Sequence, residues 1–111
     1  MNQDSINMAT FAELQDNAGA EFVAELVIAF LEEAPPMLAE LRSALAAQQS
    51  DVFRRAAHSL KSNSSAFGAD VMSEMARALE LGGLPADGVG IDALEAEYQR
   101  VAAKLTELTR G

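Results

Sequence analysis

The chain has 111 residues, of which 50% are hydrophobic, no cysteine and a formal net charge of −9. This length is typical of one domain with an apolar core, so we expect residues 1–111 to form a single domain. The absence of cysteine excludes a disulfide framework and a thiolate metal site. The acidic balance argues against nucleic acid as a partner, because binding to phosphates requires a clustered basic surface.

The sequence contains no segment that predicts insertion into a membrane. Residues 1–10 lack the basic region and the apolar core of a signal peptide. The longest apolar run, Leu26 to Leu31, is far shorter than a membrane span. We therefore expect an acidic cytoplasmic protein that is monomeric and does not bind membranes, and Met1 and the lack of a linker favour a stand-alone protein.

The first half of the chain predicts three helical segments. A short helix is expected at about 8–16, with Met8, Phe11 and Leu14 near one face, and Asn17-Ala18-Gly19 breaks it. A second helix at about 20–33 has a wide apolar stripe, formed by Phe22, Val23, Leu26, Val27, Phe30 and Leu31. Pro35-Pro36 is expected to interrupt it, and a third helix follows to about residue 48, since proline suits a first helical turn.

The second half predicts three further helices. Ser50 or Asp51 can cap a helix at 51–67, which ends at Gly68 in a left-handed turn. Asp70 can cap the next helix, at 70–81, which Gly82-Gly83 stops. Its apolar positions are Val71, Met75, Ala78 and Leu79. After a loop at 82–90, the last helix has apolar residues at three-four spacing, namely Ile91, Leu94, Tyr98, Val101, Leu105 and Leu108.

Together these segments predict an all-α fold. The segments 20–48 (kinked), 51–67, 70–81 and 90–110 fit an antiparallel up-down four-helix bundle with short loops. The short helix at 8–16 is an extra N-terminal element that would lie across one end of the bundle.

The helix at 51–67 differs from the others in its charge. Its core face comprises Phe53, Ala56, Ala57, Leu60 and Phe67, with Asn63 or Ser64 filling the gap. The opposite face surrounds the chain's single histidine, His58, with Arg54, Arg55, Lys61, Ser62 and Ser65. Residues 52–69 have three basic side chains and no acidic one, so the rest of the chain has a net charge of −12.

These residue types suit an acceptor of phosphoryl groups. A neutral imidazole is a good nucleophile near neutral pH, and a phosphorylated side chain has about two negative charges. Lys61, one turn away, can neutralise part of that charge. The small Ser62 and Ser65 leave the ring open to a large partner that must reach an in-line geometry. A metal site is disfavoured, because one histidine without an acidic neighbour in sequence does not supply a zinc ligand set.

The residues around His58 resemble the motif of histidine-containing phosphotransfer (HPt) domains. Ala57-His58-Ser59-Leu60-Lys61-Ser62, continuing to Phe67-Gly68-Ala69, is similar to the pattern A-H-x-L-K-G…G-A. The segment from Phe30 to Pro35 and the pair Leu79-Glu80 also resemble the family. The resemblance extends over residues 8 to 108, nearly the whole chain.

The resemblance implies a role for each matching residue. His58 would accept a phosphoryl group on Nε2 from a phospho-aspartate or a kinase, and Lys61 would contact the phosphoryl oxygens. Glu80 would accept a hydrogen bond from Nδ1–H and fix the tautomer, as the orienting carboxylate does in catalytic triads. Gly68 would lie where the partner comes close. Ser62 stands where the family most often has glycine, and its hydroxyl can donate to a phosphoryl oxygen.

The resemblance also implies partners and cofactors. The chain would be a phosphocarrier rather than an enzyme, with no cofactor of its own, and would exchange phosphoryl groups with a sensor histidine kinase and a receiver domain that holds Mg²⁺. The basic patch around Arg54 and Arg55 would orient the acidic receiver. Apolar contacts are expected from Met8, Phe11 and Ala12, with Phe22 or Val23.

Two alternatives remain open at the level of sequence. One is a helical adaptor that binds a receiver or kinase without accepting phosphate. The other is a small metalloprotein bundle.

Overall fold

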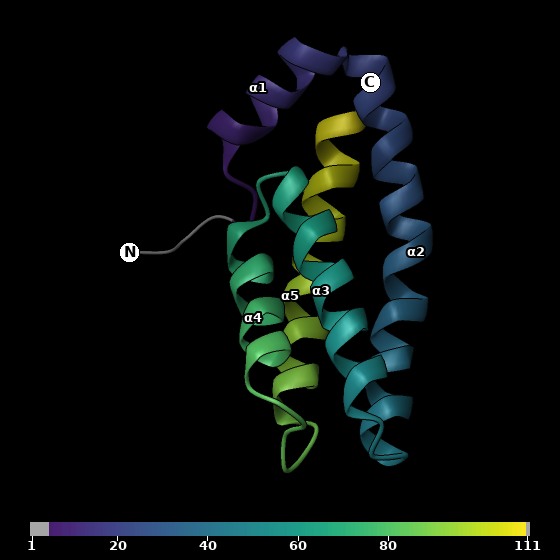
Figure 1. The fold of residues 1–111 in the computed structure, drawn as a ribbon. Helices are drawn as coiled ribbons and strands as arrows, with labels where there is room; N and C mark the ends of the chain where they lie inside the picture. The colour runs from purple at the N-terminus through teal and green to yellow at the C-terminus, as the bar shows by residue number, and fades with distance from the viewer. Residues whose placement is uncertain (1–4, 111) are drawn as a thin grey trace.

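The computed structural model describes residues 5–110 and confirms the all-α prediction, since no strand occurs among them. Its five helices are α1 (Met8–Ala18), α2 (Ala20–Ala46), α3 (Ser50–Ala66), α4 (Asp70–Leu81) and α5 (Val89–Thr109). Helices α2 to α5 run alternately up and down in a bundle, and α1 lies across one end (Figure 1). No helix in this part of the chain combines the length and the apolarity needed to cross a membrane.

Helix α2 is one continuous helix, so the predicted interruption at Pro35-Pro36 is wrong. A proline inside a helix lacks the N–H that would bond to the carbonyl four residues earlier, which for Pro35 is that of Leu31. The Tyr98 hydroxyl of α5 lies 3.4 Å from the Leu31 oxygen and donates to it. The carbonyl that Pro35 leaves without a helical donor therefore has a partner in α5.

The predicted caps of α3 and α4 are also corrected. Gln49 and Ala69 occupy the N-cap positions, and neither helix has a side-chain cap. Asp70 instead accepts a hydrogen bond from Asn7 Nδ2 at 3.2 Å. As the first residue of α4, its carboxylate also lies where the helix dipole favours negative charge.

The turn after α3 has the predicted left-handed conformation. Gly68 has φ 79°, and the amides of Ala69 and Gly68 donate to the carbonyls of Ser64 and Ser65, each at 3.0 Å. This is the hydrogen-bond pattern of a Schellman motif. It reverses the chain tightly, and α4 therefore packs directly beside α3.

The core lies between the four long helices. The predicted seam of α5 is buried from Ile91 to Leu105, and Phe30 packs against Phe67 and Tyr98 with ring centroids 5.4 and 5.9 Å apart. In α4 the fully buried residues are Met72 and Ala76. The predicted Met75 and Leu79 are half-buried and pack against the core, whereas Val71 is half-buried and Ala78 is exposed. Both sets have helical spacing, so only the rotation of α4 against its neighbours distinguishes them.

Candidate functional site

The exposed face of α3 carries the candidate site. His58 lies at its centre with 55% of its side chain exposed. The flanking Arg54, Arg55, Ser62 and Ser65 are exposed, as the helical spacing predicts. On the opposite face, Phe53, Ala56, Ala57, Leu60 and Ser64 are buried. The amphipathic pattern of α3 therefore presents His58 to solvent on a helix whose other side is anchored in the core.

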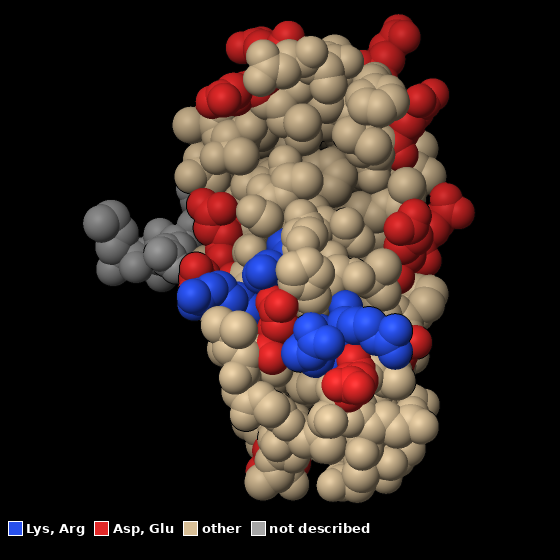
Figure 2. All heavy atoms as spheres, in the orientation of Figure 1, with Lys and Arg blue, Asp and Glu red and all other residues tan. Residues whose placement is uncertain are grey.

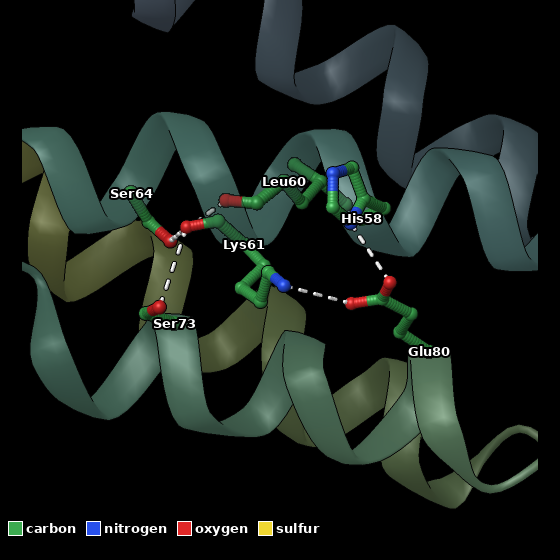
Figure 3. Close-up of polar contacts among 6 residues, drawn as sticks. All are labelled: His58, Leu60, Lys61, Ser64, Ser73 and Glu80. Atoms are coloured by element: carbon green, nitrogen blue, oxygen red, sulfur yellow. Dashed lines mark hydrogen bonds and ion pairs between the residues drawn. The ribbon is translucent and has the colours of Figure 1, made fainter.

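Glu80 of α4 contacts the histidine, as the resemblance implies. Its Oε2 lies 2.8 Å from His58 Nδ1, and only 12% of the Glu80 side chain is exposed. The two side chains come from adjacent antiparallel helices and point toward one another (Figure 3). A carboxylate in this position accepts a hydrogen bond from Nδ1–H and leaves Nε2 with its lone pair.

The electrostatics of Glu80 favour its ionised form. The hydrogen bond with His58, together with that from Lys61, holds the pKa of Glu80 below its ordinary value of 4.5, although partial burial acts in the opposite direction. An ionised Glu80 is the form that keeps the proton on Nδ1. The nitrogen left with its lone pair is then Nε2, which lies on the side of the ring away from Glu80 (Figure 3).

Lys61 is paired with the same carboxylate. Its ammonium lies 3.1 Å from Glu80 Oε1, and 28% of its side chain is exposed. One carboxylate thus binds both His58 and Lys61. The lysine is therefore engaged with Glu80, on the Nδ1 side of the imidazole.

A serine of α4 that the sequence analysis did not identify supports this arrangement. The Ser73 hydroxyl donates to the Lys61 carbonyl at 3.3 Å, and Ser64 donates to the same carbonyl at 3.1 Å (Figure 3). Ser73 lies two turns before Glu80 on α4, so Lys61 contacts α4 through both its main chain and its ammonium. In the sequence, the seven-residue spacing of Ser73 and Glu80 indicates that both lie on the same face of a helix.

The structure also adds Arg77 to the basic residues near the site. Arg77 is exposed and lies between Ser73 and Glu80 at i+4 and i−3, on the face of α4 that they share. On the surface, basic side chains gather across the middle of the face that carries α3 and α4, with acidic side chains between them and at the periphery (Figure 2). The basic patch is therefore built from two helices rather than from one.

Two of the predicted partner-docking residues are corrected. Phe11 is 1% exposed and belongs to the core, so it offers no surface to a partner. Gly68 is buried as well, and a Cβ at this position would lie 2.9 Å from both the Asn7 carbonyl oxygen and Thr10 Cβ. The close approach at this glycine comes from the chain's own N-terminal helix.

Other apolar residues near α1 remain accessible. Met8 is 43% and Phe22 is 52% exposed, Ala12 is exposed, and Val23 is buried. A groove of about 220 Å³ lies between α1, α2 and α3. Its lining is mainly apolar and includes Leu14, Leu26, Ala29, Phe30, Ala66 and Phe67. An apolar surface therefore lies along the edge of α3 next to α2.

Within residues 5–110, no three histidine, aspartate or glutamate side chains are grouped closely enough to hold a metal ion.

Comparisons with known proteins identify the family. The sequence model of the Hpt domain matches residues 25–104. The chain is also 34% identical over 79 residues to the sensor protein TorS of Escherichia coli (strain K12), a match that covers 71% of this chain and 9% of that sensor. No solved structure gives a significant match. The chain belongs to the Hpt domain family, whose members are phosphotransfer modules of two-component signalling, with histidine kinases and receiver domains as partners.

Proposed function

We propose that residues 1–111 form one phosphocarrier unit that accepts and donates a phosphoryl group through His58 Nε2. The contact that carries this proposal is the 2.8 Å hydrogen bond between His58 Nδ1 and Glu80. It holds the ring in one tautomer while the other nitrogen lies on the side of the ring away from Glu80 (Figure 3). The exchange partners are a receiver-domain aspartate and a sensor histidine kinase.

The transfer step needs little from this chain beyond positioning. The Nε2 lone pair attacks the phosphorus of an aspartyl phosphate, the P–O bond to the carboxylate breaks, and the aspartate leaves as its anion. The imidazole becomes cationic because Nδ1 keeps its proton, and the ionised Glu80 stabilises that charge. Lys61, one turn from His58 on α3, would shift from Glu80 toward the phosphoryl oxygens. We propose that Mg²⁺ belongs to the receiver and that this chain uses no cofactor.

Charge and apolar surface would act together in docking. Arg54, Arg55 and Arg77 would orient the acidic site of a receiver, and such complementarity mainly speeds association. Met8, Ala12 and Phe22, with the groove beside them, would supply apolar contact. Ser62 and Ser65 leave space around the imidazole. An interface of this kind would be small, at or below roughly 1,200 Å², as in other transient signalling contacts.

The test is phosphotransfer from a radiolabelled, phosphorylated receiver or kinase. We expect an acid-labile label on the wild type and none on His58→Gln, because the amide has no nucleophilic nitrogen. Equal labelling of both proteins would refute the role of His58. A wild type that binds phosphorylated receiver but takes no label from any active donor would instead favour an adaptor.

A further inference from the structure

Ser62 is placed to contact a group attached to His58 Nε2. It lies four residues after His58 on the exposed face of α3, and side chains at this spacing are neighbours, with about 5–6 Å between Cβ atoms. Since Nδ1 is turned toward Glu80, Nε2 lies on the outer side of the ring (Figure 3). A phosphoryl group on Nε2 would therefore extend over the exposed surface of α3 rather than into the α3–α4 interface.

The Ser62 hydroxyl has no partner among the hydrogen bonds of residues 5–110. Serine and threonine in helices commonly donate to the carbonyl three or four residues earlier. In this chain Ser64 does so to Leu60 at 2.7 Å, and Thr106 does so to Ala102 at 2.8 Å. Because the Ser62 hydroxyl makes no such bond, it is available to an incoming oxygen.

Lys61, the cation next to Ser62 in sequence, already has a partner. The Lys61 ammonium is already bound to Glu80 at 3.1 Å, on the Nδ1 side of the ring. A phosphoryl group must compete with Glu80 for this lysine, whereas it meets the hydroxyl of Ser62 without displacing any bond within the described chain.

We infer that Ser62 donates a hydrogen bond to a phosphoryl oxygen on His58 and thereby lengthens the lifetime of the phosphohistidine. The inference rests on the proposed function. In spontaneous loss, water attacks phosphorus, the P–Nε2 bond breaks, and inorganic phosphate leaves while the neutral imidazole is regenerated. The transition state of phosphoryl transfer is loose and metaphosphate-like, and its peripheral oxygens hold less charge than those of the bound group. A donor to these oxygens therefore stabilises the phosphohistidine more than its transition state.

The experiment uses phosphoramidate as a small phosphoryl donor, so that no partner protein is present. Nε2 attacks its phosphorus, the P–N bond of the donor breaks, and ammonia leaves. After removal of the donor, intact-mass spectrometry follows the phosphorylated fraction over time. We expect the half-life to fall about two- to fivefold in both Ser62→Ala and Ser62→Gly. This is less than the full contribution of a hydrogen bond to a charged group, because part of the bond persists in the transition state.

Two further variants distinguish the effect of the Ser62 hydroxyl on the half-life from effects of helix propensity and of surface polarity. Ser62→Thr keeps the hydroxyl and should restore most of the half-life. Ser43→Ala removes an exposed hydroxyl from α2, outside the face of α3 that carries His58, and should leave the half-life unchanged. Circular dichroism confirms that each variant is folded.

The possible results distinguish the role of Ser62 from the proposed function. Equal half-lives for wild type and Ser62→Ala would overturn the inference and leave the phosphocarrier function intact. A half-life that falls only in Ser62→Gly would do the same, because it would indicate an effect of helix flexibility. If the wild type takes up no phosphoryl group on His58, the proposed function itself fails, and the inference fails with it.

Discussion

The α3–α4 and α2–α5 interfaces each hold a cluster of three charged or ionisable side chains, but the clusters are built in opposite ways. At α3–α4, one carboxylate, Glu80, binds two basic groups and is largely removed from solvent. At α2–α5, one cation, Arg42, binds two carboxylates, with Asp92 at 2.9 Å and Glu95 as the second partner. All three side chains of the second cluster are well exposed.

The difference lies in what each cluster can determine. The hydrogen bonds that Arg42 donates to Glu95 and Asp92 raise the pKa of its guanidinium above the ordinary value, so its charge does not change in any physiological range. Water replaces such exposed pairs readily, and they contribute little to stability. Glu80 binds a ring with two distinct nitrogens, and its contact favours the tautomer with the proton on Nδ1. Under the proposed function the α3–α4 cluster therefore selects the nucleophilic nitrogen, whereas the α2–α5 cluster tethers two helices at the surface.

The largest expected effect concerns the turn that sets up the α3–α4 interface. Gly68→Ala places an L-residue at φ 79° and a Cβ 2.9 Å from the Asn7 carbonyl oxygen. We expect a loss of about 2–3 kcal/mol in the free energy of unfolding, or roughly 10 °C in the thermal midpoint, from left-handed strain together with displacement of α1. Thermal unfolding followed by circular dichroism measures it.

Gly83→Ala in the α4–α5 loop is the matched control. Gly83 has a similar φ, 74°, but no atom within 4 Å of an added Cβ. It should show the strain alone, about 1 kcal/mol. An equal loss in both variants would show that the contact between α1 and Gly68 contributes nothing.

The second prediction compares the two clusters by activity. Glu80→Gln keeps the shape of the side chain but no longer fixes the Nδ1–H tautomer or stabilises the imidazolium. We expect the rate of phosphotransfer to His58 to fall on the order of tenfold or more. Glu95→Gln, which alters the Arg42 cluster, should leave the rate unchanged. The rates are measured by rapid quench from a phosphorylated receiver, and a similar decrease in both variants would contradict a specific role for Glu80.

The third prediction concerns pH. The pKa of Glu80 is lowered in the folded protein, so the unfolded chain binds this proton more readily as the pH falls. The stability that Glu80 contributes is therefore complete above its ordinary pKa of 4.5 and is lost as the pH falls through the lower folded-state pKa. The difference in thermal midpoint between wild type and Glu80→Gln should shrink between about pH 5 and about pH 3. A difference that stays constant over this range would show that the carboxylate is not held in its ionised form.

The smallest effect is expected at the surface cluster. Arg42→Ala removes both ion pairs, yet solvent already screens them. The thermal midpoint should change less than in Gly68→Ala, and the rate of phosphotransfer should equal that of the wild type. A destabilisation as large as that of Gly68→Ala would mean that the α2–α5 cluster is a principal support of the bundle.

Much of the site follows from local sequence pattern. The spacing of Phe53, Ala57 and Leu60 sets one face of α3 toward the core, and His58 on the other face is then exposed whatever the neighbouring helices are. The left-handed turn at Gly68 depends on the local backbone in the same way. These features were predicted because helix periodicity and glycine conformation are properties of short segments.

The predictions that failed depend on neighbours distant in sequence. Pro35 was expected to end a helix, but Tyr98 bonds to the carbonyl that the proline leaves free. Phe11 was expected at a docking surface, but the seating of α1 buries it. The fully buried positions of α4, Met72 and Ala76, were not among those predicted, because two apolar stripes have the same period. In each case the contact joins residues that are far apart in sequence, so a pattern within a short segment does not predict it.

Helix periodicity and charge pattern were enough to predict a helical bundle with an exposed histidine in a basic patch, and the motif indicated Glu80 as the partner of that histidine. The packing of the helices sets which groups this carboxylate contacts. The rotation and register of α4 against α3 place Glu80 2.8 Å from His58 and 3.1 Å from Lys61, and Ser73 against the Lys61 carbonyl. These distances follow from the packing of two helices through the turn at Gly68, which composition and periodicity do not specify.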